Sequence, residues 1–248
     1  MGKRLIQLIN EDDTLALKAA LEREGHPQLG EDAGVIAGVS PMGVTLRQSL
    51  PDGALVQVIV DFSLPRAALE IAEACQERGI ALVVGTTGFD SAQRERLEAG
   101  ASRIPLLISP NMSRAVNLLM RLVGQTASSL GPACDIAIVE RHHRTKKDAP
   151  SGTALRLAEY ASRGRNPVPQ ARQGTESEAR QLGGIEIHAL RSGDSPGEHT
   201  VVFGMPGEVI ELSHRAFSRD GFARGALDAA KFLAGKAPGL YSMDEVLA

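Results

Sequence analysis

The fold of this chain is decided by residues 56–88, VQVIVDFSLPRAALEIAEACQERGIALVVGTTG. The run opens with an apolar, β-branched stretch (56–62) that is typical of a buried strand. Pro65 suits the first turn of a helix, and Gly79 is a natural end for it. A second apolar strand (80–84) follows, so the run predicts a strand–helix–strand unit of a parallel sheet.

The same alternation continues beyond this run. We expect a helix capped by Ser91 that ends near Ala99, a strand at 104–108 and a long helix capped by Ser113. These elements predict an α/β fold with a Rossmann-like parallel sheet. An amphipathic helix from Phe222 to Leu233 is expected to return to it, which gives a dinucleotide-binding domain of residues 1–112 and 219–248.

Residues 113–218 are expected to form a smaller α+β domain with a mixed sheet. The predicted elements are a strand at 135–140, a helix from Ser151 to Ser162, a polar loop from Arg163 to Gly184, and strands at 185–190, 200–203 and 209–214. The last strands lie close together in the sequence, which favours antiparallel or mixed pairing.

Composition excludes several classes of protein. The chain has 248 residues, of which 43% are hydrophobic, and a net charge of −3, as in ordinary globular proteins. No apolar run approaches the roughly 20 residues of a membrane helix, and we expect no signal peptide. Cys75 and Cys134 form no CxxC motif, which suits buried free thiols in a reducing cytoplasm. Aromatic residues make up only 3%, which disfavours stacking on nucleic-acid bases.

The densest group of reactive side chains is Glu140–Ala154, ERHHRTKKDAPSGTA. His142, His143 and Lys146 can exchange protons, and Ser151 begins a helix whose backbone N–H groups suit an anion. A carboxylate-binding pocket with acids beside it is one interpretation. A solvated basic loop that caps a helix is the other, and composition does not choose between them. We expect no metal site, because adjacent histidines face different ways.

This segment contains the complete pattern E-x-H-x-x-x-K-x-D-x-P-S-G-T-A, which resembles the signature of the dihydrodipicolinate reductase family. Further matches extend the resemblance over nearly the whole chain, at 20–25, 60–63, 85–89, 111–113, 193–194, 197–200, 218–219 and 222. Ala137 stands where the family has a glutamate. We expect this to matter little, because the residue lies in a strand and outside the pocket.

The resemblance implies reduction of 4-hydroxy-tetrahydrodipicolinate to tetrahydrodipicolinate in the diaminopimelate route of lysine biosynthesis, with NADH or NADPH as cofactor. It implies that His142 is a proton donor or acceptor and that Lys146 is the proton donor. The residues implied in binding the dicarboxylate substrate are His143, Ser151, Gly152, Thr153 and Arg219. It also implies a homotetramer built by sheet contacts of the second domain, and a hinge that closes over substrate.

The residues implied in cofactor binding are Met1, Glu22, Arg23, Gly85, Thr86, Thr87, Ser109, Pro110, Asn111 and Met112. Glu22 can bond a ribose 2′-hydroxyl and Arg23 can accept a 2′-phosphate, so we expect loose discrimination between the two cofactors. We expect no nucleic-acid or membrane partner and a cytoplasmic location.

The start of the chain departs from the family. Members have a first strand and a glycine-rich loop ending in G-R-M-G, whereas only Met1 and Gly2 match here. Loss of that strand would leave two neighbouring strands with unpaired backbone groups. Either Met1 is the internal methionine of the loop, or the chain is naturally truncated. Truncation would make a second function possible, that of a dicarboxylate-binding protein that no longer binds the cofactor.

We predict that the reading frame upstream of Met1 encodes a short apolar strand followed by a GxxGR-type run. Genomic sequence on the 5′ side of this codon tests the prediction, and an in-frame stop codon directly before it would defeat the prediction.

Overall fold

The structure is a computed structural model that describes residues 1–163, 171–173 and 184–248. It divides into two compact units. Unit 1 comprises Met1–Ser113 and Phe222–Ala248, and unit 2 comprises Arg114–Gly221. Each has its own hydrophobic core. Among the described residues, no helix has the length and apolar character to cross a membrane.

Unit 1 is an α/β unit in which four parallel strands are ordered β11-β5-β4-β3. Its elements are α1 (Gly2–Asn10), β1 (Ala20–Leu21), α2 (Ala33–Ala37), β2 (Leu46–Arg47), β3 (Val58–Asp61), α3 (Pro65–Arg78), β4 (Ala81–Val84), α4 (Ser91–Ala99), a 3₁₀ turn (Gly100–Ser102), β5 (Pro105–Ile108), α7 (Asp220–Leu233, which begins at the end of unit 2), β11 (Gly239–Tyr241) and α8 (Met243–Val246).

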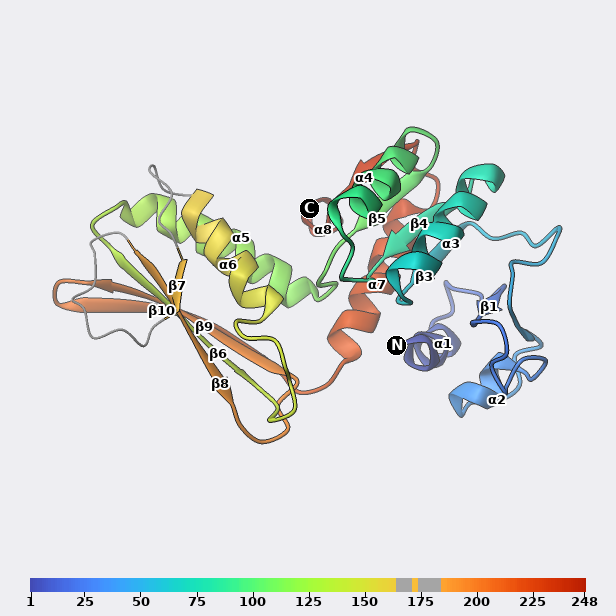
Figure 1. Ribbon diagram of the computed structural model, residues 1–248, viewed down its shortest axis with the longest axis horizontal. Coiled ribbons are helices and arrows are strands. Elements are labelled where there is room, and N and C mark those ends of the chain that lie inside the picture. Colours follow the sequence, from blue (N-terminus) through green and yellow to red (C-terminus); the bar gives the residue numbers. More distant parts are fainter. Residues whose placement is uncertain (164–170, 174–183) are drawn as a thin grey trace. The chain divides into compact units, whose positions relative to one another are not determined.

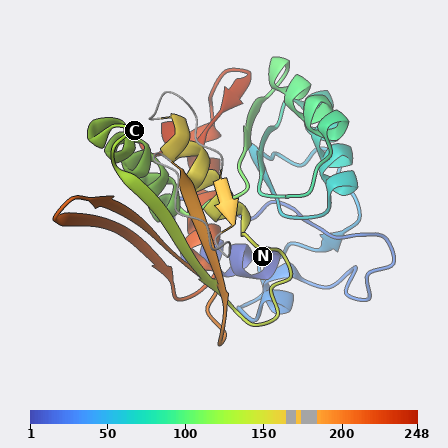
Figure 2. The ribbon, with the colours of Figure 1, turned by 60° about the vertical axis from the view of Figure 1, so that its left-hand side comes forward.

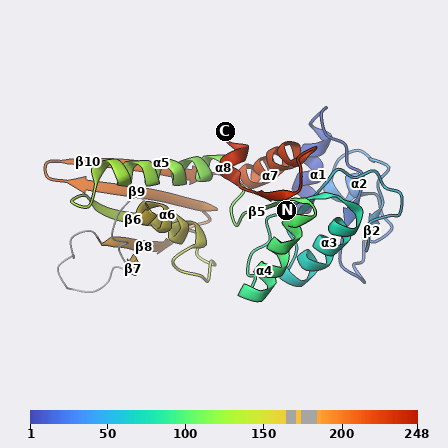
Figure 3. The ribbon, with the colours of Figure 1, turned by 90° about the horizontal axis from the view of Figure 1, so that it is seen from above.

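The parallel sheet of unit 1 is buried on both faces. Ala81, Val83 and Leu107 point to the face that packs against α1 and α7. Leu82 and Leu106 point to the opposite face, which α3 and α4 cover (Figure 3). Covering both faces requires apolar side chains at successive positions, which explains the continuous apolar run of β4.

Two helices of unit 1 show how the sequence sets helix ends. In α3, Pro65 is the first residue and Gly79 ends the helix in the left-handed conformation, as predicted. The predicted cap of α4 was wrong by one residue. Asp90, not Ser91, is the N-cap: its carboxylate accepts from the Gln93 backbone N–H at 2.8 Å, and the Gln93 side chain accepts from the Asp90 N–H.

The main sheet is open, and within the described residues each of its edge strands, β3 and β11, pairs on one side only. β3 pairs only with β4, and β1 pairs with β2 in a separate two-stranded sheet. The expectation that a missing first strand leaves neighbouring strands unpaired stays a prediction. The helix α1 was not predicted from the sequence.

Unit 2 contains a five-stranded mixed sheet, ordered β10-β9-β6-β8-β7. Its elements are α5 (Arg114–Leu130), β6 (Asp135–His142), α6 (Gly152–Arg163), β7 (Ala171–Gln173), β8 (Ile185–Arg191), β9 (Gly197–Met205) and β10 (Glu208–Ala216). The pairs of β6 with β8 and of β7 with β8 are parallel, whereas β9 is antiparallel to both β6 and β10. The predicted fold class is therefore confirmed.

The predicted loop from Arg163 to Gly184 needs a correction. Its first residue ends α6, and Ala171–Gln173 forms β7, which pairs with β8. So short a strand leaves no periodic pattern from which it could be predicted. Residues 164–170 and 174–183 lie outside the described residues, so the rest of this prediction does too.

Among the described residues, helices cover only one face of the unit 2 sheet, and these helices are α5 and α6 (Figures 1 and 2). In β9, Val201 and Phe203 point into this core, whereas Thr200 and Val202 point to the opposite face and are partly exposed. The strict alternation of buried and exposed residues is typical of a sheet with one covered face.

We predict that Phe203→Ala destabilises the protein by about 3–5 kcal/mol, because this fully buried ring leaves a cavity in the core of unit 2. Phe217→Ala is the matched control, since Phe217 is 92% exposed, and it is expected to change stability by less than about 0.5 kcal/mol. Urea unfolding followed by circular dichroism measures both. Equal effects of the two substitutions would contradict the packing described here.

Candidate active site

The candidate site begins where the core of unit 2 becomes polar. Along β6, Ile136 and Ile138 point into the apolar core, and Glu140 and His142 follow on the same face. Both polar side chains are buried, and Glu140 has no exposed surface at all. Period-2 alternation along the strand therefore carries a carboxylate and an imidazole into the protein interior.

Strand register brings partners from other strands to these two residues. His199 of β9 lies opposite Glu140, and Arg191 of β8 lies opposite His142. His214 of β10 lies opposite His199, so the row continues across another strand. His142 and His199 meet edge to face, with ring centroids 5.2 Å apart.

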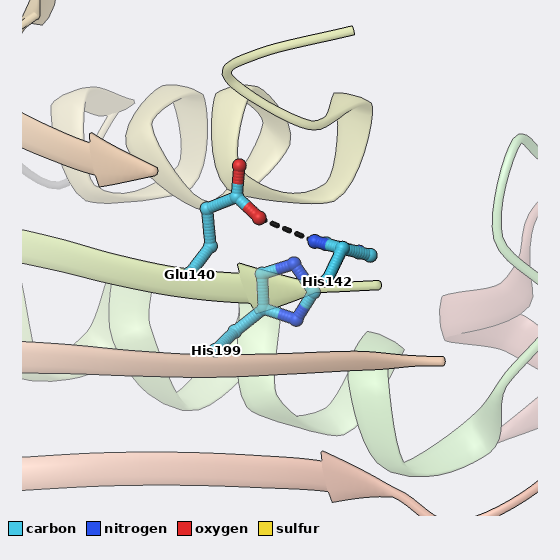
Figure 4. A group of neighbouring side chains, drawn as sticks. All are labelled: Glu140, His142 and His199. Carbon is cyan, nitrogen blue, oxygen red and sulfur yellow. Dashed lines mark hydrogen bonds and ion pairs between the residues drawn. The ribbon is translucent and has the colours of Figure 1, made fainter. Parts of the chain in front are cut away.

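The Glu140 carboxylate is the acceptor at the centre of this group. Figure 4 shows it directed at the His142 ring, where Oε2 is paired with Nδ1. Its other oxygen, Oε1, accepts from Arg191 Nη2 at 2.9 Å and from the Ser151 backbone N–H at 3.1 Å. Glu140 thereby connects β6, β8 and the N-terminus of α6.

These contacts determine the charges in the site. Burial alone would raise the pKa of Glu140, but the hydrogen bonds from Arg191 and His142 outweigh it and lower the pKa. Burial lowers the pKa of His142 by more than the bond to Glu140 raises it. At neutral pH the carboxylate is therefore ionised and the imidazole is neutral, so Nδ1–H donates to Glu140.

His199 and His214 are also held neutral. Burial, followed by repulsion from His142, lowers the pKa of His199 to about 4, and burial lowers the pKa of His214. His199 Nε2 lies 3.2 Å from the Ser151 hydroxyl. Its Nδ1, the Nδ1 of His214 and Nε of Arg191 are buried and have no hydrogen-bond partner among the described residues.

Lys146 lies in the turn after β6 and is close enough to His142 that its charge lowers the pKa of that imidazole. Its Nζ donates to both carboxylate oxygens of Asp148, at 2.7 and 2.8 Å. His143, which is half-buried, has Nδ1 2.7 Å from the Thr145 hydroxyl. The structure therefore gathers His142, His143 and Lys146 at one end of the sheet.

The remaining predicted substrate-binding residues differ in burial and in their position in unit 2. Ser151 is buried, and its hydroxyl accepts from the Ala154 N–H, so it caps α6 as predicted. Gly152 and Thr153 form the first turn of α6. Arg219 is exposed just before α7. The substrate-binding role of each of these residues stays a prediction.

Glu140, His142 and His199 each offer an atom that could ligate a metal ion, and these atoms lie within 4.8 Å of one another. In this structure, however, the two oxygens of Glu140 already accept hydrogen bonds from His142, Arg191 and Ser151. The site is thus neutralised by its own guanidinium and N–H groups. The expectation that the chain binds no metal stays a prediction.

In unit 1, the predicted cofactor residues lie mainly after parallel strands. Gly85, Thr86 and Thr87 follow β4, and Ser109–Met112 follows β5, which is the strand beside β4. The two segments therefore share the carboxyl edge of the sheet, where open α/β sheets bind their ligands. Glu22 and Arg23 follow β1, and Met1 precedes α1.

The segment after β4 contacts Asp61, the last residue of β3, and Phe62, which follows it. The Thr86 hydroxyl donates to the buried Asp61 carboxylate at 2.5 Å, and the Gly85 N–H donates to the Asp61 carbonyl at 2.8 Å. A side chain at Gly85 would collide with the ring of Phe62. The absence of a side chain at Gly85 thus leaves room for the Phe62 ring, and the role of this loop in cofactor binding stays a prediction.

Sequence reasoning missed the contacts that Arg191, His199 and Asp61 make in the two predicted sites, and it gave Glu140 no role of its own. The pattern E-x-H places Glu140 and His142 on one face of a strand, which could have identified this pair. The partners on β8 and β9 depend on strand register, which no local pattern gives.

Two models of one protein family together match nearly the whole chain. "Dihydrodipicolinate reductase, N-terminus" matches residues 1–112, and "Dihydrodipicolinate reductase, C-terminus" matches residues 115–247. The 4-hydroxy-tetrahydrodipicolinate reductase of Anaeromyxobacter sp. (strain Fw109-5) is 48% identical, with 100% of this chain and 93% of the relative covered. The protein of the same name from Syntrophobacter fumaroxidans is 46% identical, with 100% and 94% covered.

Solved structures share the fold. Dipicolinate-bound dihydrodipicolinate reductase from Paenisporosarcina sp. TG-14 superposes with a TM-score of 0.76 at 22% identity, covering 97% of this chain and 92% of that one. An amine dehydrogenase from Mycobacterium smegmatis gives 0.64 at 13% identity, covering 98% and 92%. The two family models cover nearly the whole chain, and the relative from Anaeromyxobacter is 48% identical over the full length of this chain. These matches show that this chain belongs to the dihydrodipicolinate reductase family.

Proposed function

We propose that this protein is a nicotinamide-dependent oxidoreductase that reduces 4-hydroxy-tetrahydrodipicolinate to tetrahydrodipicolinate, in the diaminopimelate route of lysine biosynthesis. The observation that carries the proposal is the buried Glu140–His142 pair beside Lys146 and the first turn of α6. Proton-exchanging groups and N–H donors for a carboxylate are thereby gathered in unit 2. Relatives that match the whole chain and bear the name of this enzyme support the same function.

In this proposal, unit 2 holds the dicarboxylate. His143, Gly152 and Thr153 bind its carboxylates, with Ser151 shaping the helix N-terminus and Arg219 contributing a cation. Reduction adds one hydride and one proton to the ring, and the hydroxylated form also loses water. Lys146 donates the proton to the ring carbon next to the one that receives the hydride, and His142 accepts or donates a proton in the same site.

Unit 1 binds the nicotinamide cofactor, which supplies the hydride when bound. Met1, Gly85–Thr87 and Ser109–Met112 hold it at the carboxyl edge of the parallel sheet. Glu22 and the exposed Arg23 are adjacent, so a ribose 2′-hydroxyl and a 2′-phosphate are both accommodated. We therefore propose that both NADH and NADPH are used.

The uncovered face of the unit 2 sheet supports a homotetramer built through this sheet. This face carries Ala137, Val139, Leu190, Val202 and Val209, of which Leu190 and Val209 are 50% and 58% exposed. The same face carries charged residues, among them the ion pair of Arg141 with Glu198, so it is mixed in character. Partly exposed apolar side chains between such groups favour association with another copy. The proposed location is the cytoplasm, in keeping with the free thiols of Cys75 and Cys134.

Titration of the purified 248-residue chain with NADH, NADPH and pyridine-2,6-dicarboxylate, together with a reductase assay, tests the proposed function. Binding of both kinds of ligand and oxidation of the cofactor only with substrate present are expected. Binding of the dicarboxylate without either cofactor would instead favour a binding protein that lacks hydride transfer.

We predict that Lys146→Ala and His142→Ala each lower kcat by about 10²- to 10⁴-fold, because each removes a group that transfers a proton. Cofactor affinity is expected to stay unchanged, since the cofactor binds residues of unit 1. Steady-state kinetics and cofactor titration measure both quantities. Lys147→Ala is the control, and near-normal turnover of the Lys146 variant would refute its role.

We also predict that the wild-type assembly has about four times the chain mass of 26.2 kDa. Val202→Asp is expected to reduce the assembled mass, because it introduces charge on the uncovered sheet face. Leu155→Asp is the control, since Leu155 is 43% exposed on α6, which covers the other face. Sedimentation velocity measures the masses, and equal dissociation of both variants would argue against assembly through the sheet.

A further inference from the structure

We infer that Glu140 is the positioning residue of this site: its buried carboxylate, paired with Arg191, fixes the His142 imidazole as the Nδ1–H tautomer and leaves Nε2 to exchange the proton. This inference rests on the proposed function for its catalytic consequence. The tautomer itself is a property of the folded chain and can be measured without any turnover.

The hydrogen bonds around Glu140 allow only one arrangement. Oε1 already accepts from Arg191 at 2.9 Å and from the Ser151 N–H at 3.1 Å, and Oε2 faces His142 Nδ1. An ionised carboxylate has no proton to give, so the nitrogen that faces it must be the donor. A neutral imidazole with its proton on Nδ1 has its lone pair on Nε2.

Arg191 keeps the carboxylate in the acceptor state. Its guanidinium donates to Glu140 Oε1, to the Asp148 carbonyl at 2.5 Å and to the Leu190 carbonyl at 2.8 Å. It is therefore held on three sides and cannot easily turn away from Glu140. The other titratable groups around this pair are His199, with His214 behind it, Lys146 and Asp148. Lys146 lowers the pKa of both His142 and His199, and His214 lowers the pKa of His199, whereas the Asp148 carboxylate is paired with Lys146.

The opposite edge of the His142 ring lies against a glycine. A Cβ at Gly197 would lie 2.9 Å from His142 Nε2 and 3.3 Å from its Cδ2, and the residue has φ of +156°. Only a residue without a side chain leaves room for Nε2 at this place. The ring is thus held at Nδ1 by Glu140 and given space at Nε2 by Gly197.

A purely structural role for Glu140 makes a different prediction. A buried ion pair commonly holds elements together, and its loss lowers stability without altering chemistry in the folded fraction. A positioning role also changes the proton affinity of His142 and the turnover of fully folded protein. Measurements on folded protein therefore separate the two roles.

The direct test is Glu140→Gln, which keeps the shape but presents an amide NH₂ to His142 and so favours the reversed tautomer. We expect kcat to fall by at least about 10²-fold, with KM for substrate and the affinity for pyridine-2,6-dicarboxylate changed by less than about threefold. The apparent pKa of His142, from its NMR titration and from the pH profile of kcat, is expected to fall, because the carboxylate raises it in the wild type.

Glu159→Gln is the matched control, because Glu159 pairs with Arg156 on the half-exposed surface of α6 in the same unit. It is expected to change neither kcat nor the His142 titration. The double variant Glu140→Gln, Arg191→Met covers the case in which the single variant fails to fold, since it removes the guanidinium left without its carboxylate. We expect it to regain stability but not turnover, and not the wild-type titration of His142.

Wild-type kcat and an unchanged His142 titration in folded Glu140→Gln would overturn the inference, as would recovery of turnover in the double variant. If the wild-type protein does not reduce the substrate, the proposed function fails. In that case, a shifted His142 titration in Glu140→Gln still supports the tautomer assignment, and an unshifted one still refutes it.

Discussion

The arrangement of the candidate site in unit 2 depends on one buried carboxylate. Glu140 has no exposed surface, yet it is ionised, because Arg191, His142 and the Ser151 N–H all donate to it. Removing a charge from water costs several kcal/mol unless partners replace the hydration shell. The two strands and the helix N-terminus that supply these partners are therefore held in one arrangement, and this arrangement is the site.

The position of the site follows from the sheet. Side-chain alternation on β6 directs Ile136 and Ile138 into the apolar core and then Glu140 and His142 into the same layer. The covering helix α6 begins at this end of the strand, so its first N–H groups lie beside the acid–base residues. The chain belongs to the dihydrodipicolinate reductase family, and we propose that this arrangement holds an anionic ring and moves a proton.

Much of the fold could be predicted because it is encoded locally. β4 is a continuous apolar run, and α3 has proline at its start and glycine after its end. The helix α1 was missed, although Leu5, Leu8 and Ile9 recur at helical spacing and pack into one core. The cap of α4 was assigned to Ser91 because serine and aspartate cap equally well, and only the hydrogen bonds distinguish Asp90.

The site was predictable only in part. His142, Lys146 and the turn of α6 lie within one segment, and a family pattern covers it. Arg191 lies 51 residues after Glu140 in the chain, and its contact depends on the parallel register of β6 and β8. His199 reaches Glu140 through the antiparallel register of β9. Register is set by the packing of the whole sheet, so these partners had no signature in the sequence.

The central claim is that an ionised Glu140 fixes the tautomer of a neutral His142. The most direct measurement is ¹⁵N NMR of the wild-type protein with labelled histidine side chains at neutral pH. We expect that His142 Nδ1 carries the proton and that Nε2 has the ¹⁵N chemical shift of an unprotonated ring nitrogen. A protonated Nε2, alone or together with a protonated Nδ1, would contradict it.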